Sequence, residues 1–183
     1  MIAAALVIFA SLYVLATRQL RLATLGLLAV FVGSNLLTTG LAPRAEITLS
    51  GSAALAAVVI LYLAARDGEF GEDPAWRVWP AIAISAIATT LAFRVFATTD
   101  VDRYLQLSAF WLLAVGLGVL LTARGPVRAV LGALLMLSGT QEVMRFDPGP
   151  HLAVAITFAW LEVGFALVGA YLIVGARTLE ERA

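Results

Sequence analysis

The chain is a succession of apolar segments, each about twenty residues long, separated by short stretches that hold arginines, prolines and acids. A helix of about 20 mainly apolar residues crosses the hydrocarbon core of a bilayer, where backbone polar groups find partners only inside a helix or a closed barrel. Seven segments of this kind cover residues 1–17, 21–41, 47–65, 78–97, 104–122, 127–146 and 151–175. Hydrophobic residues make up 62% of the 183 residues, well above the level of about 45–50% in soluble domains. The sequence therefore predicts an all-α, polytopic membrane protein with seven transmembrane helices.

The arginines predict how these helices are oriented. With seven spans, eight of the twelve basic residues fall on one side of the membrane and four on the other, and cytoplasmic loops carry the excess of positive charge. The eight are Arg18, Arg21, Arg66, Arg77, Arg124, Arg128, Arg177 and Arg182, and the four are Arg44, Arg94, Arg103 and Arg145. The first segment has no positive residues before it, so it is expected to be retained instead of being removed as a signal peptide. We expect the N-terminus outside and the C-terminus in the cytoplasm.

The residue types exclude several classes of function. The net charge is zero and every basic residue is an arginine, so no basic patch indicates a nucleic-acid partner. Cysteine and lysine are absent from the sequence, which excludes disulfides, thiolate metal sites and a Schiff base on lysine. A single histidine, His151, argues against bis-histidine haem and most zinc sites. We expect no metal and no cofactor.

An offset of 106 residues aligns the sequence with itself, placing residues 18–35 over 124–141 without a gap. The aligned pairs are Arg18 with Arg124, Gly26 with Gly132, Gly33 with Gly139, and Asn35 with Gln141. Glycines seven residues apart share a helix face and allow another helix to approach closely. A chance alignment of apolar helices is the alternative. The offset predicts two parallel three-helix repeats, 1–66 and 104–183, joined over 67–103 by an acidic cytoplasmic loop and a linker helix.

Two stretches carry a family resemblance. The segment "LYVLATRQLRLATLGLLAVFVGSNLL" resembles the first helical hairpin of the MrpC subunit of multisubunit sodium/proton antiporters and of the K subunit (NuoK) of respiratory complex I. "AITFAWLE", which ends at Glu162, is similar to the third helix of the K subunit around its membrane glutamate. A chain of two such units is similar to component E of hydrogenase-4 and related complexes. The resemblance implies a membrane subunit of a complex-I-like machine.

The chain also departs from that family. The K subunit has a second glutamate two residues after the hairpin glycine, where this sequence has Leu28 and Leu134, and the hydrogenase component has one where Leu137 stands. The offset pairs Glu162 with Ala56. The resemblance therefore implies a structural N-terminal copy and a C-terminal copy with a single proton-active site.

Glu162 lies close to the middle of an apolar segment. A charged side chain costs at least about 2.5–3.5 kcal/mol at the bilayer centre, and such residues usually face the bundle interior or water and are functional. Desolvation disfavours the charged form, so one carboxyl group there could both accept and release a proton. Either Glu162 is a proton relay, or it is a permanently protonated group that hydrogen-bonds to a neighbouring helix.

Other polar residues are candidates for the same path. Glu142 and Arg145 are three apart, so they could form an interfacial ion pair or the external mouth of a path. Arg94 could reach the surface or pair with Glu142. The candidate proton path comprises Glu162, Glu142, Arg94, Asn35, Gln141 and His151. For Asn35 and Gln141 interhelical hydrogen bonds are the alternative, and for His151 an interfacial position.

The resemblance implies a non-catalytic subunit that lines part of a proton path and bridges antiporter-like subunits in a bacterial or archaeal cell membrane. The complex would be a membrane-bound hydrogenase, a formate hydrogenlyase or an Mrp-type antiporter. A purely structural membrane subunit is one alternative. A SWEET-like solute transporter has the same three-one-three repeat, but the prolines here lie at loops or helix ends. An intramembrane enzyme lacks any recognisable motif.

Overall fold

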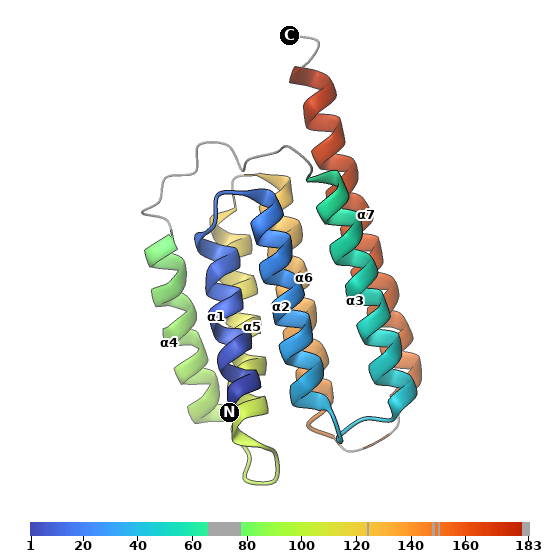
Figure 1. The fold of residues 1–183 in the computed structure, drawn as a ribbon. Helices are drawn as coiled ribbons and strands as arrows, with labels where there is room; N and C mark the ends of the chain where they lie inside the picture. Colours follow the sequence, from blue (N-terminus) through green and yellow to red (C-terminus); the bar gives the residue numbers. More distant parts are fainter. Residues whose placement is uncertain (66–77, 124, 148, 150, 181–183) are drawn as a thin grey trace.

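A computed structural model of the chain describes residues 1–65, 78–123, 125–147, 149 and 151–180. Within these ranges the chain forms seven α-helices (Figure 1). They are α1 (Ile2–Ala16), α2 (Leu20–Thr38), α3 (Arg44–Ala64), α4 (Val78–Phe96), α5 (Arg103–Thr122), α6 (Pro126–Met144) and α7 (Leu152–Glu180). The prediction of an all-helical chain is confirmed. The acidic loop 66–77, with its arginines Arg66 and Arg77, lies outside the described residues. So do Arg124 and Arg182.

Five of these helices are long and apolar enough to cross a membrane: α2, α3, α4, α5 and α7 over Leu152–Gly175. The first helix has only 15 residues, which span about 22 Å at 1.5 Å per residue. The 19 residues of α6 include Arg128, Gln141 and Glu142, which lower its apolar character. Five spans by length and composition are consistent with a multi-pass membrane protein, and they are two fewer than the seven predicted.

Local sequence explains where several helices begin. The Asp102 carboxylate accepts hydrogen bonds from the backbone N–H groups of Tyr104 (2.6 Å) and Leu105 (3.3 Å), so it caps α5. Pro126 occupies the first turn of α6, where its missing N–H is not needed. The third helix begins directly after Pro43, three residues earlier than predicted, and this places Glu46 in its first turn.

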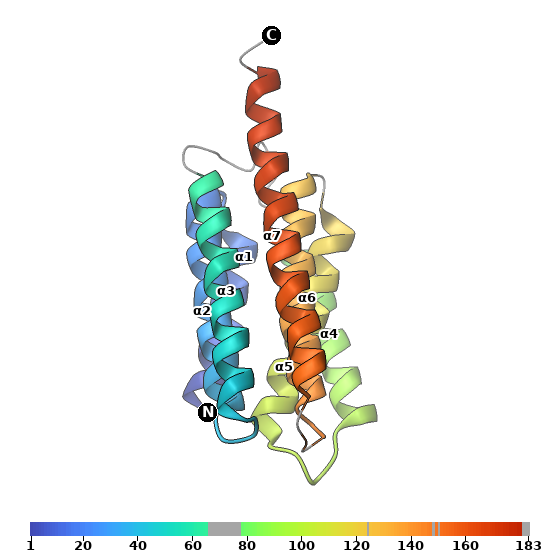
Figure 2. The ribbon, with the colours of Figure 1, turned by 90° about the vertical axis from the view of Figure 1, so that its right-hand side faces the viewer.

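The helices run alternately up and down, so the two termini lie at opposite ends of the bundle (Figure 1). Figure 2 shows two layers: α1, α2 and α3 form one, and α4, α5, α6 and α7 form the other. The three most extensive contacts between the layers join α1 with α5, α2 with α6 and α3 with α7. In each of these pairs the two helices run in the same direction (Figure 1).

Two glycines bring α2 against α1. A Cβ atom at Gly26 would lie 2.8 Å from Val14 Cγ2, and one at Gly33 would lie 2.6 Å from Val7 Cγ2 and 3.3 Å from the Ala3 carbonyl oxygen. These distances are too short for a side chain, so α1 and α2 approach as closely as glycine allows.

The same arrangement recurs between α6 and α5. A Cβ atom at Gly132 would lie 2.9 Å from the Gly116 carbonyl oxygen, and one at Gly139 would lie 3.0 Å from the Ala109 carbonyl oxygen. Gly116 stands at the offset of 106 residues from Ala10, whose carbonyl oxygen lies near Gly26. The glycines singled out in the sequence thus all lie at close helix contacts.

Hydrogen bonds inside the bundle connect helices that are far apart in the sequence. Trp111 of α5 donates its indole N–H to Ser11 Oγ of α1 at 2.8 Å. On the other side of α5, the Ser85 hydroxyl of α4 donates to the Ala114 carbonyl oxygen at 3.2 Å. Because α4 packs mainly against α5, it lies at the edge of the bundle, away from α3 and α7.

Candidate functional site

Glu162 is fully buried, at 0% exposure, in the middle of the apolar part of α7. It stands ten residues after the start of the helix, a rise of about 15 Å and thus half the thickness of a bilayer core. Its Oε1 accepts a hydrogen bond of 2.7 Å from the side-chain amide of Gln141. Its Oε2 is buried without a partner among the described residues. The structure thus places a carboxyl group near the middle of a long apolar helix, held by one amide.

Gln141 connects Glu162 to a third helix. Its Oε1 accepts a hydrogen bond of 3.2 Å from the Ser50 hydroxyl, so α3, α6 and α7 are joined through Ser50, Gln141 and Glu162 in sequence. Gln141 was predicted to make interhelical hydrogen bonds or to hydrate a path. The interhelical bonds are present.

A small cavity lies on the other side of Gln141, near the ends of four helices. It has a volume of about 30 Å³, enough for one or two water molecules. Its polar lining comes from α2, α3, α6 and the residue that precedes α7, and consists of Ser34, Asn35, Thr38, Ser50, Ser138, Gln141, Glu142, Arg145 and His151. Glu162 is not in that lining. Glu162 therefore lies outside the cavity, and Gln141 contacts both.

Glu142 faces this cavity from α6. Its exposure is 1%, and neither carboxylate oxygen has a hydrogen-bond partner among the described residues. The hydroxyl groups of Ser34 and Ser108 lie beside the carboxylate but make no hydrogen bond of good geometry. A buried carboxyl group with unused oxygens is costly unless it is protonated or bonded to water.

Arg145 pairs with Glu46, in the first turn of α3, and not with Glu142. Of the two alternatives for Glu142 and Arg145, the ion pair between them is therefore not formed. The second Glu46 oxygen accepts a hydrogen bond of 2.8 Å from the backbone N–H of His151. Arg145 has turned away from Glu142 because it is the C-terminal cap of α6, where the helix ends and the side chain reaches α3.

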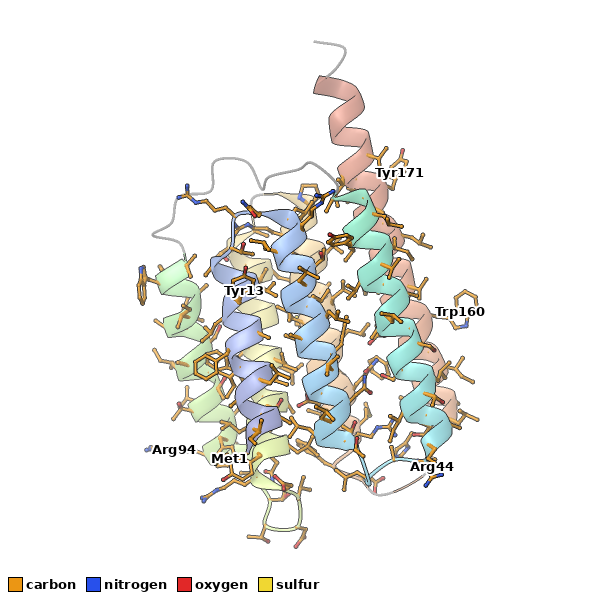
Figure 3. The ribbon with its side chains drawn as sticks, viewed as in Figure 1. Met1, Tyr13, Arg44, Arg94, Trp160 and Tyr171 are labelled. Atoms are coloured by element: carbon orange, nitrogen blue, oxygen red, sulfur yellow. The ribbon has the colours of Figure 1, made fainter. Side chains whose placement is uncertain are left out.

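Five of the six predicted path residues gather here: Glu162, Glu142, Asn35, Gln141 and His151. The sixth, Arg94, lies apart from them. It occupies the last turn of α4 and points outward at the edge of the bundle (Figure 3). It contacts neither Glu142 nor the cavity, as expected for an arginine that reaches the surface.

Sequence reasoning missed Glu46 and Ser50. An acid in the first turn of a helix is common because it interacts favourably with the helix dipole, so Glu46 alone gives no signal. Its partner is 99 residues away. Ser50 lies one turn further along α3, on the cavity side, and the spacing of four residues to Glu46 was the one available hint.

The donor set at the site does not suggest a metal. In the part of the chain that the structure describes, no three His, Cys, Asp or Glu side chains are grouped closely enough to hold a metal ion. The site consists of amide, hydroxyl and carboxyl groups together with the Arg145 guanidinium and the His151 imidazole, which can move a proton or order water. Comparison of the chain with models of protein families, with curated proteins and with solved structures finds no match.

Proposed function

We propose that the protein is a non-catalytic membrane subunit of a complex-I-like, ion-translocating complex, in which Glu162 takes up and releases a proton. One observation carries the proposal: a fully buried carboxyl group at mid-length of an apolar helix is linked, through Gln141, to a polar cavity near the helix ends. The cost of a carboxyl group at that depth favours a functional role over chance.

Among the described residues, the polar groups of the proposed path lie in one half of the bundle. They lead from Glu46 and Arg145 at the helix ends, past Glu142, to Gln141 and Glu162. Beyond Glu162, residues 163–175 of α7 hold no charged side chain. Tyr171 in this stretch is 76% exposed and points out of the bundle (Figure 3). A proton at Glu162 needs an exit in a neighbouring subunit, which favours a partner such as an antiporter-like subunit.

We further propose the repeat and the orientation. The repeat is supported by α2 and α6, which have the same length at the offset of 106 residues, and by the matching glycine contacts of Gly26 with Gly132 and Gly33 with Gly139. The arginine distribution supports an external N-terminus, so the cavity would open outside. The host membrane would be the inner membrane of a bacterium or the cell membrane of an archaeon.

A structural subunit is the second candidate, because the bond from Gln141 to Glu162 also fits a permanently protonated, helix-linking glutamic acid. A sugar carrier is disfavoured, because the polar cavity of about 30 Å³ is far smaller than a ligand site. The larger hollows, of about 430 and 330 Å³, are lined mostly by apolar residues.

The test has two parts. Purification of the tagged protein from native membranes, followed by mass spectrometry, should recover large antiporter-like subunits, with or without hydrogenase subunits. A lone monomer or homo-oligomer would contradict the proposed complex.

Glu162→Gln in that complex should leave assembly intact and lower ion translocation in vesicles by about tenfold or more, because the amide keeps the shape but cannot titrate. Asp147→Asn, which neutralises an exposed carboxylate near the same helix ends, is the matched control. Unchanged translocation in Glu162→Gln would leave the structural role.

A further inference from the structure

Gln141 separates the cavity from Glu162. Its side chain lines the cavity and donates the hydrogen bond that holds Glu162, whereas Glu162 is fully buried and absent from the lining. Four titratable or charged groups face or border the cavity: Glu142 and Arg145 from α6, Glu46 from α3 and His151 before α7. A proton that reaches the cavity therefore meets an amide before it meets Glu162.

A primary amide is a poor carrier of protons. Its nitrogen donates two hydrogen bonds and its oxygen accepts, but neither group gains or loses a proton in the physiological range. A continuous transfer from cavity water to Glu162 is therefore interrupted at Gln141. The amide has to move before the carboxyl group can exchange its proton.

The two neighbours of Gln141 fit such a movement. The amide nitrogen donates to Glu162 Oε1 and the amide oxygen accepts from Ser50, an arrangement that suits an ionised carboxylate, which only accepts. A protonated carboxyl group can still accept this bond with its carbonyl oxygen, but its O–H, on Oε2, has no acceptor among the described residues. Rotation of the amide by about 180° would offer it the carbonyl oxygen and turn the NH2 group toward Ser50 Oγ.

Ser50 can serve both orientations. A serine in a helix can donate its hydroxyl to the carbonyl oxygen three or four residues earlier, and two neighbours on α3 do so. Thr48 donates to the Ala45 carbonyl oxygen at 2.9 Å, and Ser52 donates to that of Leu49 at 2.8 Å. With its proton on the backbone, Ser50 Oγ is free to accept from the rotated amide. In both orientations the amide nitrogen and the amide oxygen of Gln141 each have a partner.

We propose that Gln141 is a gate between the cavity and Glu162, whose amide rotates each time the carboxyl group changes its protonation state. The proton passes from a hydronium ion in the cavity to the Glu162 carboxylate, which leaves one water molecule and a neutral carboxyl group. Gln141 positions the exchanging group and carries no proton itself. The inference rests on the proposed function of Glu162.

The test is the rate of hydrogen–deuterium exchange of the Glu162 carboxyl group, followed by infrared spectroscopy on the full chain in lipid vesicles. The Glu162→Gln variant identifies the carboxyl band. Gln141→Ala removes the amide and extends the cavity toward Glu162, so exchange should become about tenfold faster or more.

Gln141→Leu fills the same space without hydrogen bonds, so exchange should become about tenfold slower or more. Thr140→Ala is the matched control, because the Thr140 hydroxyl donates to the Met136 carbonyl oxygen of its own helix and does not contact Glu162. Its exchange rate should equal that of the unaltered chain.

A second pair of variants tests the gate with a smaller change. Ser50→Ala removes the group that holds the amide oxygen and should speed exchange, whereas Ser52→Ala, on the exposed side of α3, should not. An exchanging Glu162 band with the same rate in all Gln141 and Ser50 variants would overturn the gate and leave the proposed function standing. A Glu162 band that exchanges in none of the variants would overturn both.

Discussion

Glu46 and Arg145, 99 residues apart in the sequence, form an ion pair that fastens the first turn of α3 to the end of α6. The same carboxylate accepts a hydrogen bond from the backbone N–H of His151, just before α7. The Arg145 side chain is 12% exposed and the Glu46 side chain is 2% exposed. Three helix ends around the cavity thus meet at one carboxylate.

Loss of this pair should destabilise the bundle. Because Glu46→Gln leaves the Arg145 guanidinium without its counter-charge, we expect a loss of about 3 kcal/mol in the free energy of unfolding. The double variant Glu46→Gln with Arg145→Gln should lose less than the sum of the single variants. Chemical unfolding in detergent, followed by circular dichroism, measures both.

Arg44→Gln is the control for that experiment, since Arg44 lies in the same turn of α3 and its side chain is exposed (Figure 3). Additive losses in the double variant would show that Glu46 and Arg145 act independently.

The close glycine contacts predict a difference between two Gly→Ala variants. Alanine at Gly139 would place Cβ 2.8 Å from the Leu113 backbone nitrogen, so α5 and α6 would have to separate. We expect a loss of about 1–3 kcal/mol in the free energy of unfolding. Gly164 of α7 has open space around it, so alanine there should be neutral or slightly stabilising. Equal unfolding midpoints for the two variants would contradict the packing described here.

Replacement of Glu142 should raise the stability of the protein but lower its function. Both of its carboxylate oxygens are buried without partners among the described residues, so Glu142→Gln loses no hydrogen bond and removes a charge. The variant should be more stable by about 1–2 kcal/mol. Translocation by the assembled complex should fall, because the cavity would lose one of its titratable groups. A less stable Glu142→Gln protein would mean that the carboxylate has a partner.

The sequence predicted the helices well because the signals involved are local. Apolar segments of membrane-spanning length, with arginines and prolines between them, gave seven helices whose ends differ from the observed ones by a few residues. The largest consequence of such a difference is at α3, where a start at Arg44 instead of residue 47 brings Glu46 into the helix.

Which polar residues contact each other was harder to predict from the sequence. Gln141 and Glu162 could be named because each interrupts an apolar helix, but their contact depends on how α6 packs against α7. The three-residue spacing suggested a pair between Glu142 and Arg145, and the structure has Arg145 bound to Glu46 instead. A local rule failed there because the helix ends at Arg145, and a long side chain at a helix end can reach another helix.

The glycine contacts between α1 and α2, and between α5 and α6, have a consequence for motion. Helices in such close contact over two turns have no room to slide or tilt against each other. The α1–α2 hairpin and the α5–α6 hairpin therefore each move as a rigid unit. The groups that reach Glu162 lie on α3, α6 and α7, of which α3 and α7 belong to neither hairpin. Apart from rotation of the Gln141 amide, a larger opening toward Glu162 would therefore be a displacement of the α3–α7 pair relative to two rigid hairpins.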